Sequence, residues 1–161
     1  EEKGDPAATA VENACGKAKD VFDKLTESEK REYVVLGADT VVFIDGKILG
    51  KPKSEEEAKE MLRCLSARTH EVVTGYSLCF CGGEISDKSV SSVKFNALTE
   101  KLIKEYVASG KPMDKAGAYG IQEYGAAFVK GICGDYFNVV GLPICRLCDV
   151  LKKEFETDIF A

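Results

Sequence analysis

The stretch YVVLGADTVVF, residues 33–43, is an apolar run interrupted only by a glycine, Asp39 and Thr40. β-Branched residues are frequent in it, which favours a buried strand. Asp45-Gly46 follows at once and is a strong two-residue signal for a tight hairpin. Residues 47–49 then predict a short returning strand, so the stretch predicts the first β-hairpin of the fold.

Helices and further strands are predicted on both sides of this hairpin. Residues 7–25 repeat apolar side chains at three- and four-residue steps, which is the spacing of a helix. Ser54 and Glu57 have the spacing of a capping box, which predicts the start of a second helix. Residues 70–80 and 89–95 are strand-like and are separated by a glycine-containing turn.

The second half of the chain continues this irregular alternation. We expect a helix over 98–108, a glycine-punctuated loop over 109–125, and a hairpin formed by 126–132 and 136–140. Pro143 predicts the first turn of a last helix. The order of elements predicts an α/β fold in which a mixed, twisted β-sheet is flanked by helices in two lobes.

Composition narrows the class of protein. A length of 161 residues suits one domain over 1–161, and the net charge of −5 disfavours a nucleic-acid partner. No apolar stretch is long enough to span a bilayer, and the polar, acidic start is unlike a signal peptide, so no membrane partner is expected. The seven cysteines then suggest reduced thiols in a cytoplasmic protein. A homodimer is compatible with the sequence.

Asp39 is the first candidate for chemistry. A carboxylate inside an apolar strand is costly to bury unless it is paired or binds a metal. The functional interpretation is a metal ligand or a general base in a cleft, and the structural alternative is an aspartate that bonds the local backbone. The sequence alone leaves both open.

The segment DKAGAYGIQ, residues 114–122, is the second candidate. Its glycines and alanines let backbone amides approach a ligand closely, and Lys115 could meet a phosphate or a base edge. The alternative is an ordinary surface loop. Lys51 alone carries little information, and His70, the only histidine, is interpreted as a packing residue.

Several enzyme classes are disfavoured. The chain contains no Walker A motif and no Gly-x-Gly-x-x-Gly, so neither nucleotide-binding fingerprint applies. A Ser-His-Asp hydrolase is also disfavoured, because Gly-x-Ser-x-Gly is absent and there is a single histidine. The residues alone predict an enzyme-like α/β domain without naming its substrate.

Five motifs together resemble one known family. GADTVV (37–42), GKP (50–52), LSARTHEVVTG (65–75), DKAGAYGIQ (114–122) and GDYFNVVGLP (134–143) resemble the Maf family in order and in spacing. The resemblance covers essentially the whole chain. It implies a fold similar to inosine triphosphatase and an enzyme that cleaves nucleoside triphosphates to monophosphate and pyrophosphate with a divalent metal, Mg²⁺ or Mn²⁺.

The resemblance also implies roles for individual residues. Asp39 looks like the proton acceptor that activates water for attack on the α-phosphorus, and it would also contact the metal. Glu2 resembles the family's acidic residue before the first long helix, with a catalytic and metal-binding role. Lys17 and Lys51 look like phosphate-binding lysines, with Lys51 assigned to catalysis; Lys115 is assigned to substrate binding.

Substrate choice follows from two positions. Thr40 and Gln122 match the branch of the family that prefers dTTP and UTP, with modified pyrimidine nucleotides as a further substrate class. The Gln122 amide can pair with the O4/N3 edge of thymine or uracil. A site built to bond one edge rejects bases that leave its polar groups unpaired. A purine-directed enzyme is therefore the weaker alternative.

One departure from the family concerns the N-terminus. The family begins with a Ser-x-Ser-Pro-Arg-Arg loop that resembles a phosphate cradle, and this sequence contains no such motif. We therefore expect an N-terminally truncated domain. A second hypothesis is a non-catalytic Maf-like paralogue or fragment that binds a nucleotide or a partner, since the family has been linked to inhibition of septum formation in bacteria.

Overall fold

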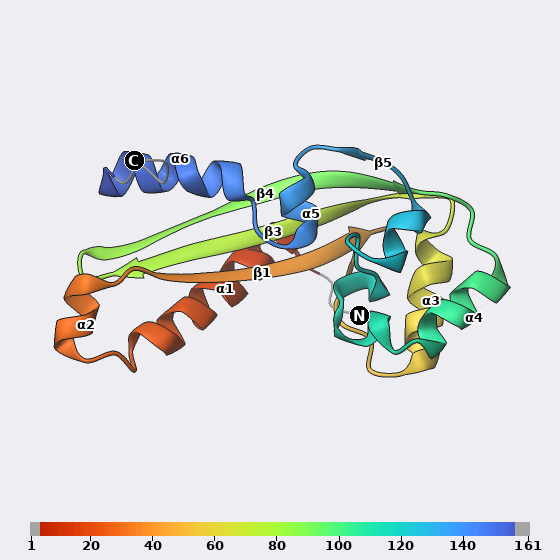
Figure 1. Cartoon of the computed structure of the whole chain (residues 1–161), viewed down its shortest axis with the longest axis horizontal. Helices are drawn as coiled ribbons and strands as arrows, with labels where there is room; N and C mark the ends of the chain where they lie inside the picture. Colours follow the sequence, from red (N-terminus) through yellow and green to blue (C-terminus); the bar gives the residue numbers. More distant parts are fainter. Residues whose placement is uncertain (1–3, 157–161) are drawn as a thin grey trace.

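One five-stranded sheet forms the centre of the computed structural model, which describes residues 4–156 (Figure 1). Its strand order is β2-β1-β3-β4-β5, and all four pairings are antiparallel. The α/β class is confirmed, whereas the expected mixed sheet is antiparallel throughout the described chain. Tight turns join β1 to β2 and β3 to β4, and such turns oblige antiparallel pairing. The strands are β1 (Val35–Ile44), β2 (Lys47–Leu49), β3 (Thr69–Phe80), β4 (Gly83–Phe95) and β5 (Val129–Cys133).

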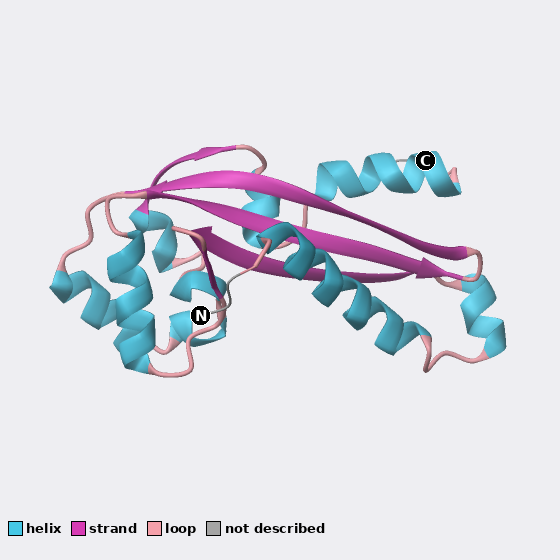
Figure 2. Cartoon of the chain, turned by 180° about the vertical axis from the view of Figure 1, so that it is seen from behind, coloured by secondary structure: helices cyan, strands magenta, loops and turns pink. Residues whose placement is uncertain are grey.

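Helices cover both faces of the sheet and one of its ends. α1 runs along one face, α6 lies over the opposite face, and α3 and α4 pack together at one end (Figures 1 and 2). No helix within residues 4–156 is long and apolar enough to cross a membrane. The helices are α1 (Pro6–Phe22), α2 (Glu27–Glu32), α3 (Glu55–Leu65), α4 (Glu100–Ala108), α5 (Tyr136–Val140) and α6 (Ile144–Phe155), with short 3₁₀ segments η1 (Lys111–Asp114), η2 (Ala116–Ala118) and η3 (Tyr124–Phe128).

α1 lies directly on the backbone of the sheet. Ala10, Ala14 and Ala18 repeat every four residues, so they form one face of the helix, and all three are fully buried. They meet Gly37 of β1 and Gly75 of β3. A Cβ at Gly37 would lie 2.3 Å from Ala14 O, and one at Gly75 would lie 2.5 Å from the carbonyl carbon of Ala10. Glycine is therefore required at both places for the helix to approach this closely.

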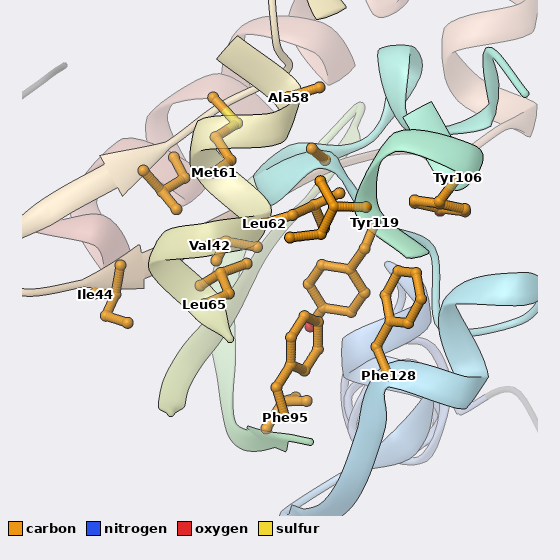
Figure 3. Packing of buried hydrophobic residues seen from close by; sticks show 14 of the residues in the cluster. Val42, Ile44, Ala58, Met61, Leu62, Leu65, Phe95, Tyr106, Tyr119 and Phe128 are labelled. Carbon is orange, nitrogen blue, oxygen red and sulfur yellow. The ribbon is translucent and has the colours of Figure 1, made fainter. Parts of the chain in front are cut away.

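The largest apolar cluster lies between the sheet and the α3–α4 end. Phe95, Tyr119 and Phe128 pack there in edge-to-face contacts, together with residues of α3 such as Leu62 (Figure 3). His70 joins the same cluster: it is 2% exposed, and its Nε2 lies 2.7 Å from the Tyr119 hydroxyl. This burial agrees with the packing role predicted for His70. The cluster holds the 116–122 segment against the sheet.

The predicted strand at 136–140 is wrong, because this segment is the helix α5. Asp135 caps it by accepting a 2.8 Å hydrogen bond from Phe137 N, and Gly141 ends it with a φ of 127°. The apolar, β-branched composition suggested a strand, but local capping at both ends decides for a helix. The partner strand is also shorter than predicted, since β5 begins at Val129.

The short helix α2 was not predicted. Thr26 and Glu29 form a complete capping box, in which Thr26 Oγ1 accepts from Glu29 N and the Glu29 carboxylate accepts from Thr26 N. That Thr-x-x-Glu spacing is visible in the sequence. No residue of α2 is buried, so it carries no apolar periodicity that would reveal a helix.

Candidate active site

A cleft of about 1200 Å³ opens beside β1 and gathers the predicted site residues. α1, β1, the segment after β2 and the 111–123 segment all contribute to its lining. β2 pairs with β1 only at Val42–Ile44, and residues 38–41 just before this pairing line the cleft. Glu2 lies outside the described residues, so its role stays a prediction. The other six predicted residues line the cleft: Lys17, Asp39, Thr40, Lys51, Lys115 and Gln122.

Two side chains of α1 hold the Asp39 carboxylate. Lys17 Nζ lies 2.5 Å from Asp39 Oδ1, and Asn13 Nδ2 donates to Asp39 Oδ2 at 2.9 Å. Lys17 also donates to Ala38 O at 3.0 Å. Asn13 and Lys17 are four residues apart, so they share one face of the helix. The contact of α1 with Gly37 brings that face to the carboxylate.

This geometry argues against the structural alternative for Asp39, in which the carboxylate bonds the local backbone. Within residues 4–156, its carboxylate is bonded by side chains of another element rather than by the local backbone. The side chain of Asp39 is 20% exposed. Each carboxylate oxygen accepts one hydrogen bond and keeps lone-pair capacity. Asp39 can therefore take a proton from a water molecule, or share an oxygen with a cation, at the cleft.

Thr40 lies on the opposite face of β1 from Asp39, because successive strand residues alternate. Its Oγ1 lies 2.8 Å from Thr74 Oγ1, and Thr74 donates to Asn138 O at 2.9 Å. A hydroxyl has one proton, so Thr74 must accept from Thr40. Thr40 therefore presents only acceptor capacity to the cleft.

Asn138 fixes this side of the cleft. It is fully buried, and its Nδ2 donates to Val72 O at 3.1 Å and to Ser91 Oγ at 2.9 Å. These bonds tie α5 to the two neighbouring strands β3 and β4. Thr40 is thereby positioned through Thr74 by an element that lies almost a hundred residues further along the chain.

A backbone hydrogen bond joins the two glycine-containing loops of the cleft. Gly117 N donates to Gly50 O at 3.0 Å, which links the loop that carries Lys51 to the loop that carries Lys115. Gly117 has a φ of 65°, and a Cβ there would lie 2.9 Å from a methyl group of Val42. Glycine is needed for both reasons. The loops that carry Lys51 and Lys115 are therefore held together by a backbone hydrogen bond.

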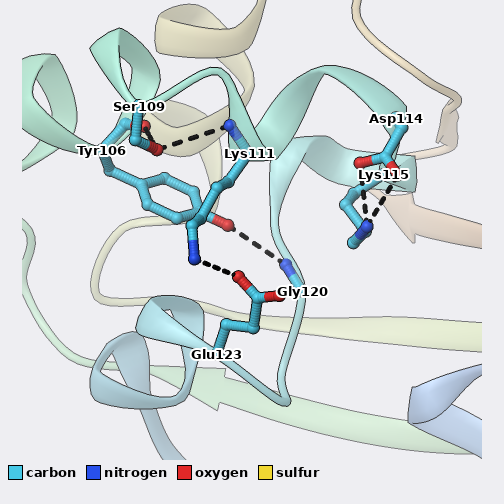
Figure 4. A network of polar contacts seen from close by, with 7 residues as sticks. All are labelled: Tyr106, Ser109, Lys111, Asp114, Lys115, Gly120 and Glu123. Carbon is cyan, nitrogen blue, oxygen red and sulfur yellow. Dashed lines mark hydrogen bonds and ion pairs between the residues drawn. The ribbon is translucent and has the colours of Figure 1, made fainter.

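Charges of both signs line the cleft in equal numbers. Lys115 pairs with Asp114 at 2.8 Å, and this contact lowers the pKa of the Asp114 carboxyl (Figure 4). Lys51 and Lys53 form no ion pair with any residue of the described chain. The lining contains six lysines (Lys17, Lys47, Lys51, Lys53, Lys111 and Lys115) and six acidic residues (Asp39, Glu56, Glu57, Glu60, Asp114 and Glu123).

A polyphosphate in such a cleft would need positive charge beyond that of the lining. In the part of the chain that the structure describes, no three His, Cys, Asp or Glu residues gather into a ready-made metal site. Mg²⁺ is commonly held by one or two carboxylates together with substrate phosphates and water. Asp39 fits that mode of binding, because its oxygens are at the cleft surface.

Sequence reasoning missed some residues of this site. Asn13 was missed, although its four-residue spacing from Lys17 is a usable signal. Tyr106, Lys111 and Glu123 also line the cleft, and no spacing in the sequence points to them. A carboxylate beside lysines and glycine-containing loops defines a site suited to a phosphorylated ligand.

The chain belongs to the Maf family: residues 1–154 match the family described as Maf-like protein. It is 54% identical over 135 residues to the dTTP/UTP pyrophosphatase of Clostridioides difficile (strain 630), which covers 83% of this chain and 70% of that protein. The dTTP/UTP pyrophosphatase of Thermococcus onnurineus (strain NA1) is 51% identical over 140 residues, covering 87% and 73%. That of Alkaliphilus metalliredigens (strain QYMF) is 44% identical over 160 residues, covering 98% and 81%.

Proposed function

We propose that this protein is a nucleoside triphosphate pyrophosphatase that hydrolyses dTTP and UTP to the monophosphate and pyrophosphate. The observation that carries the proposal is the Asp39 carboxylate, which Lys17 and Asn13 hold at a cleft lined by lysines and a glycine-containing loop. The dTTP/UTP pyrophosphatases that match most of the chain support the substrate class.

In the proposed reaction Asp39 acts as a general base. It accepts a proton from a water molecule as the water oxygen forms a bond to the α-phosphorus. The bond from the α-phosphorus to the bridging oxygen breaks, and pyrophosphate leaves with that oxygen. Lys17 and Asn13 keep the carboxylate in one orientation, which lowers the cost of arranging the base for proton transfer.

The phosphates are proposed to lie between Lys17 and the paired loops. Lys51 would stabilise charge that develops on the leaving pyrophosphate, and Lys115 would bind the substrate near the glycine-containing loop. Asp39, with the predicted Glu2, would hold a divalent cation against the phosphates. Such a cation neutralises phosphate charge, which agrees with a cleft lining whose own charges balance.

The base is proposed to lie against Thr40 and Gln122. Thr40 offers an acceptor to the cleft, and the Gln122 amide offers both a donor and an acceptor. Together they suit the O4/N3 edge of thymine or uracil. A cytoplasmic location and a homodimeric assembly stay predictions.

The test is turnover of dTTP and UTP by the full chain with Mg²⁺ or Mn²⁺, with products resolved by ion-exchange chromatography. Water enriched in the heavy oxygen isotope should label dTMP and leave pyrophosphate unlabelled, because attack is at the α-phosphorus. Asp39→Asn keeps the shape of the side chain and removes the base, so turnover should fall at least about a hundredfold. EDTA should abolish turnover, and added metal should restore it.

Asp20→Asn is the matched control, since Asp20 lies on α1 in an exposed ion pair with Lys24. It should retain the activity of the parent chain. If a folded parent chain binds dTTP but never cleaves it, the proposal is wrong and the non-catalytic binding hypothesis takes its place. Label appearing in pyrophosphate would overturn the proposed site of attack.

A further inference from the structure

The loop that carries Gln122 is clamped by contacts to its neighbours. Tyr106, near the end of α4, accepts a hydrogen bond through its hydroxyl from Gly120 N at 3.3 Å (Figure 4). On the other side, a Cβ at Gly125 would lie 2.3 Å from Gly120 O, so η3 packs on the loop backbone. The backbone just before Gln122 is therefore enclosed from two directions.

An ion pair closes the clamp just after Gln122. Lys111 Nζ lies 2.5 Å from Glu123 Oε2, and the same ammonium group lies 4.3 Å from the centre of the Tyr124 ring. The contact with Lys111 lowers the pKa of the Glu123 carboxyl. Lys111 and Glu123 both line the cleft, and they join the start of η1 to the end of the loop. Gln122 thus lies between two anchored residues, Gly120 and Glu123.

The Gln122 side chain, unlike Gly120 and Glu123, forms no hydrogen bond with the described residues. An amide can pair with the O4/N3 edge of uracil or, after turning over, with the N4/N3 edge of cytosine, whose donor and acceptor are exchanged. The Gln122 amide alone therefore does not select between these bases. Thr40 offers only an acceptor to the cleft, which suits the N3–H of uracil and not the unprotonated N3 of cytosine, provided that the backbone at Gln122 keeps the base edge in place. A loose loop lets the base edge move away from Thr40, so this discrimination is lost.

We propose that Tyr106 and the Lys111–Glu123 ion pair are positioning residues that set selectivity for thymine and uracil over cytosine by clamping Gln122. The inference rests on the proposed function and deepens it. It assigns part of the selectivity of the cleft to contacts that act through the position of Gln122.

The experiment measures kcat and KM for dTTP and dCTP with Mg²⁺, using competitive inhibition if dCTP is turned over too slowly. The dTTP-to-dCTP ratio of kcat/KM should fall about fivefold in Tyr106→Phe, which loses one partly buried hydrogen bond. It should fall about threefold in Lys111→Glu or Glu123→Lys, because the ion pair is partly exposed. The loss should appear mainly in KM for dTTP, since the reacting phosphorus lies at Asp39 and not at the loop.

The charge-swapped chain, Lys111→Glu with Glu123→Lys, should recover the parent ratio to within about twofold, because the ion pair is rebuilt in reverse. Lys101→Glu is the matched control: it makes the same change of charge on α4 in the exposed Lys101–Glu105 pair, whose atoms are 3.8 Å apart. It should leave the ratio unchanged. Circular dichroism checks folding, and if Tyr106→Phe does not fold, the ion-pair variants and the swap decide.

Three outcomes would each overturn the inference. The ratio could stay unchanged in the folded variants, or the charge-swapped chain could show the summed losses of the two single variants. Lys101→Glu could also lower the ratio as much as Lys111→Glu does. The proposed function is judged separately. If the parent chain cleaves dTTP and Asp39→Asn does not, the function stands whatever the ratios show. If the parent chain does not cleave dTTP, the function fails and the inference fails with it.

Discussion

Substitution of glycine by alanine should have opposite effects on the stability of the fold at Gly37 and at Gly16. Gly37→Ala adds a methyl group where β1 meets α1, and its Cβ would lie 2.3 Å from Ala14 O and 2.7 Å from Ala18 N. Both contacts are with backbone atoms, which cannot rotate away. Gly16→Ala adds the same methyl group on the exposed side of α1, where nothing lies within 4 Å.

The change in the free energy of unfolding that each substitution causes can be estimated from these contacts. Relief of the Gly37 overlap requires α1 to move by roughly 1 Å, and overpacking of this kind costs about 1–3 kcal/mol of stability. We expect the upper end, because two elements must separate along their length. Gly16→Ala should instead stabilise the chain by about 0.4–1 kcal/mol, because it restricts the unfolded chain in a helix-compatible position.

Urea unfolding followed by far-UV circular dichroism measures both free energies, and the absence of tryptophan makes dichroism preferable to fluorescence. Gly37→Ala should also lower turnover beyond its effect on folding, because movement of α1 displaces Lys17 and Asn13 from Asp39. A Gly37→Ala chain as stable as the parent would refute the reasoning. So would a Gly16→Ala chain destabilised to the same extent as Gly37→Ala.

Two further predictions concern buried polar groups. Burial lowers the pKa of His70 from 6.5 to about 4. The unfolded chain therefore binds a proton that the folded chain rejects, and His70 alone should lower the free energy of unfolding by about 3 kcal/mol as the pH drops from 6.5 to 4. Since His70 is the only histidine, its single NMR titration reports the shift, and a midpoint at the ordinary value would contradict it. Asn138→Ala removes the bonds to Val72 O and Ser91 Oγ and should cost about 2–3 kcal/mol in urea unfolding. Asn96→Ala, at an exposed 3.4 Å bond to Ala127 O, is its control and should cost less than about 0.5 kcal/mol; equal losses would argue against the role of burial.

Apolar patterns in the sequence predicted most of the elements, whereas elements set by caps and contacts set by tertiary packing were missed. The apolar run around Asp39 predicted β1, because a buried strand needs β-branched and apolar residues along its length. Residues 136–140 have a similar composition but form α5, since Asp135 and Gly141 cap them. Composition describes what a segment can bury, whereas the caps and the buried bonds of Asn138 determine its conformation.

The same distinction applies to the site. Asp39 was predictable because a charge inside an apolar run is costly wherever it lies. The spacing of Asn13 from Lys17 could have placed the two on one face of α1, but the contact of that face with Asp39 depends on Gly37 and Gly75 and is not visible in the sequence. The Lys111–Glu123 pair spans twelve residues and leaves no periodic trace in the sequence.

The close contacts that shape the cleft therefore occur at glycines, which have no side chain. Gly37 and Gly75 bring α1 to Asp39, Gly117 joins the loops of Lys51 and Lys115, and Gly125 lets η3 enclose the loop before Gln122. None of these glycines carries a functional group, but each allows two elements that line the cleft to approach closely. An added methyl group at any of them would lie within 3.0 Å of a neighbouring atom and force that neighbour to shift, and proton transfer and base pairing are sensitive to small displacements. The tolerance of the site to change should consequently be lower at these glycines than at the exposed lysines that line the cleft.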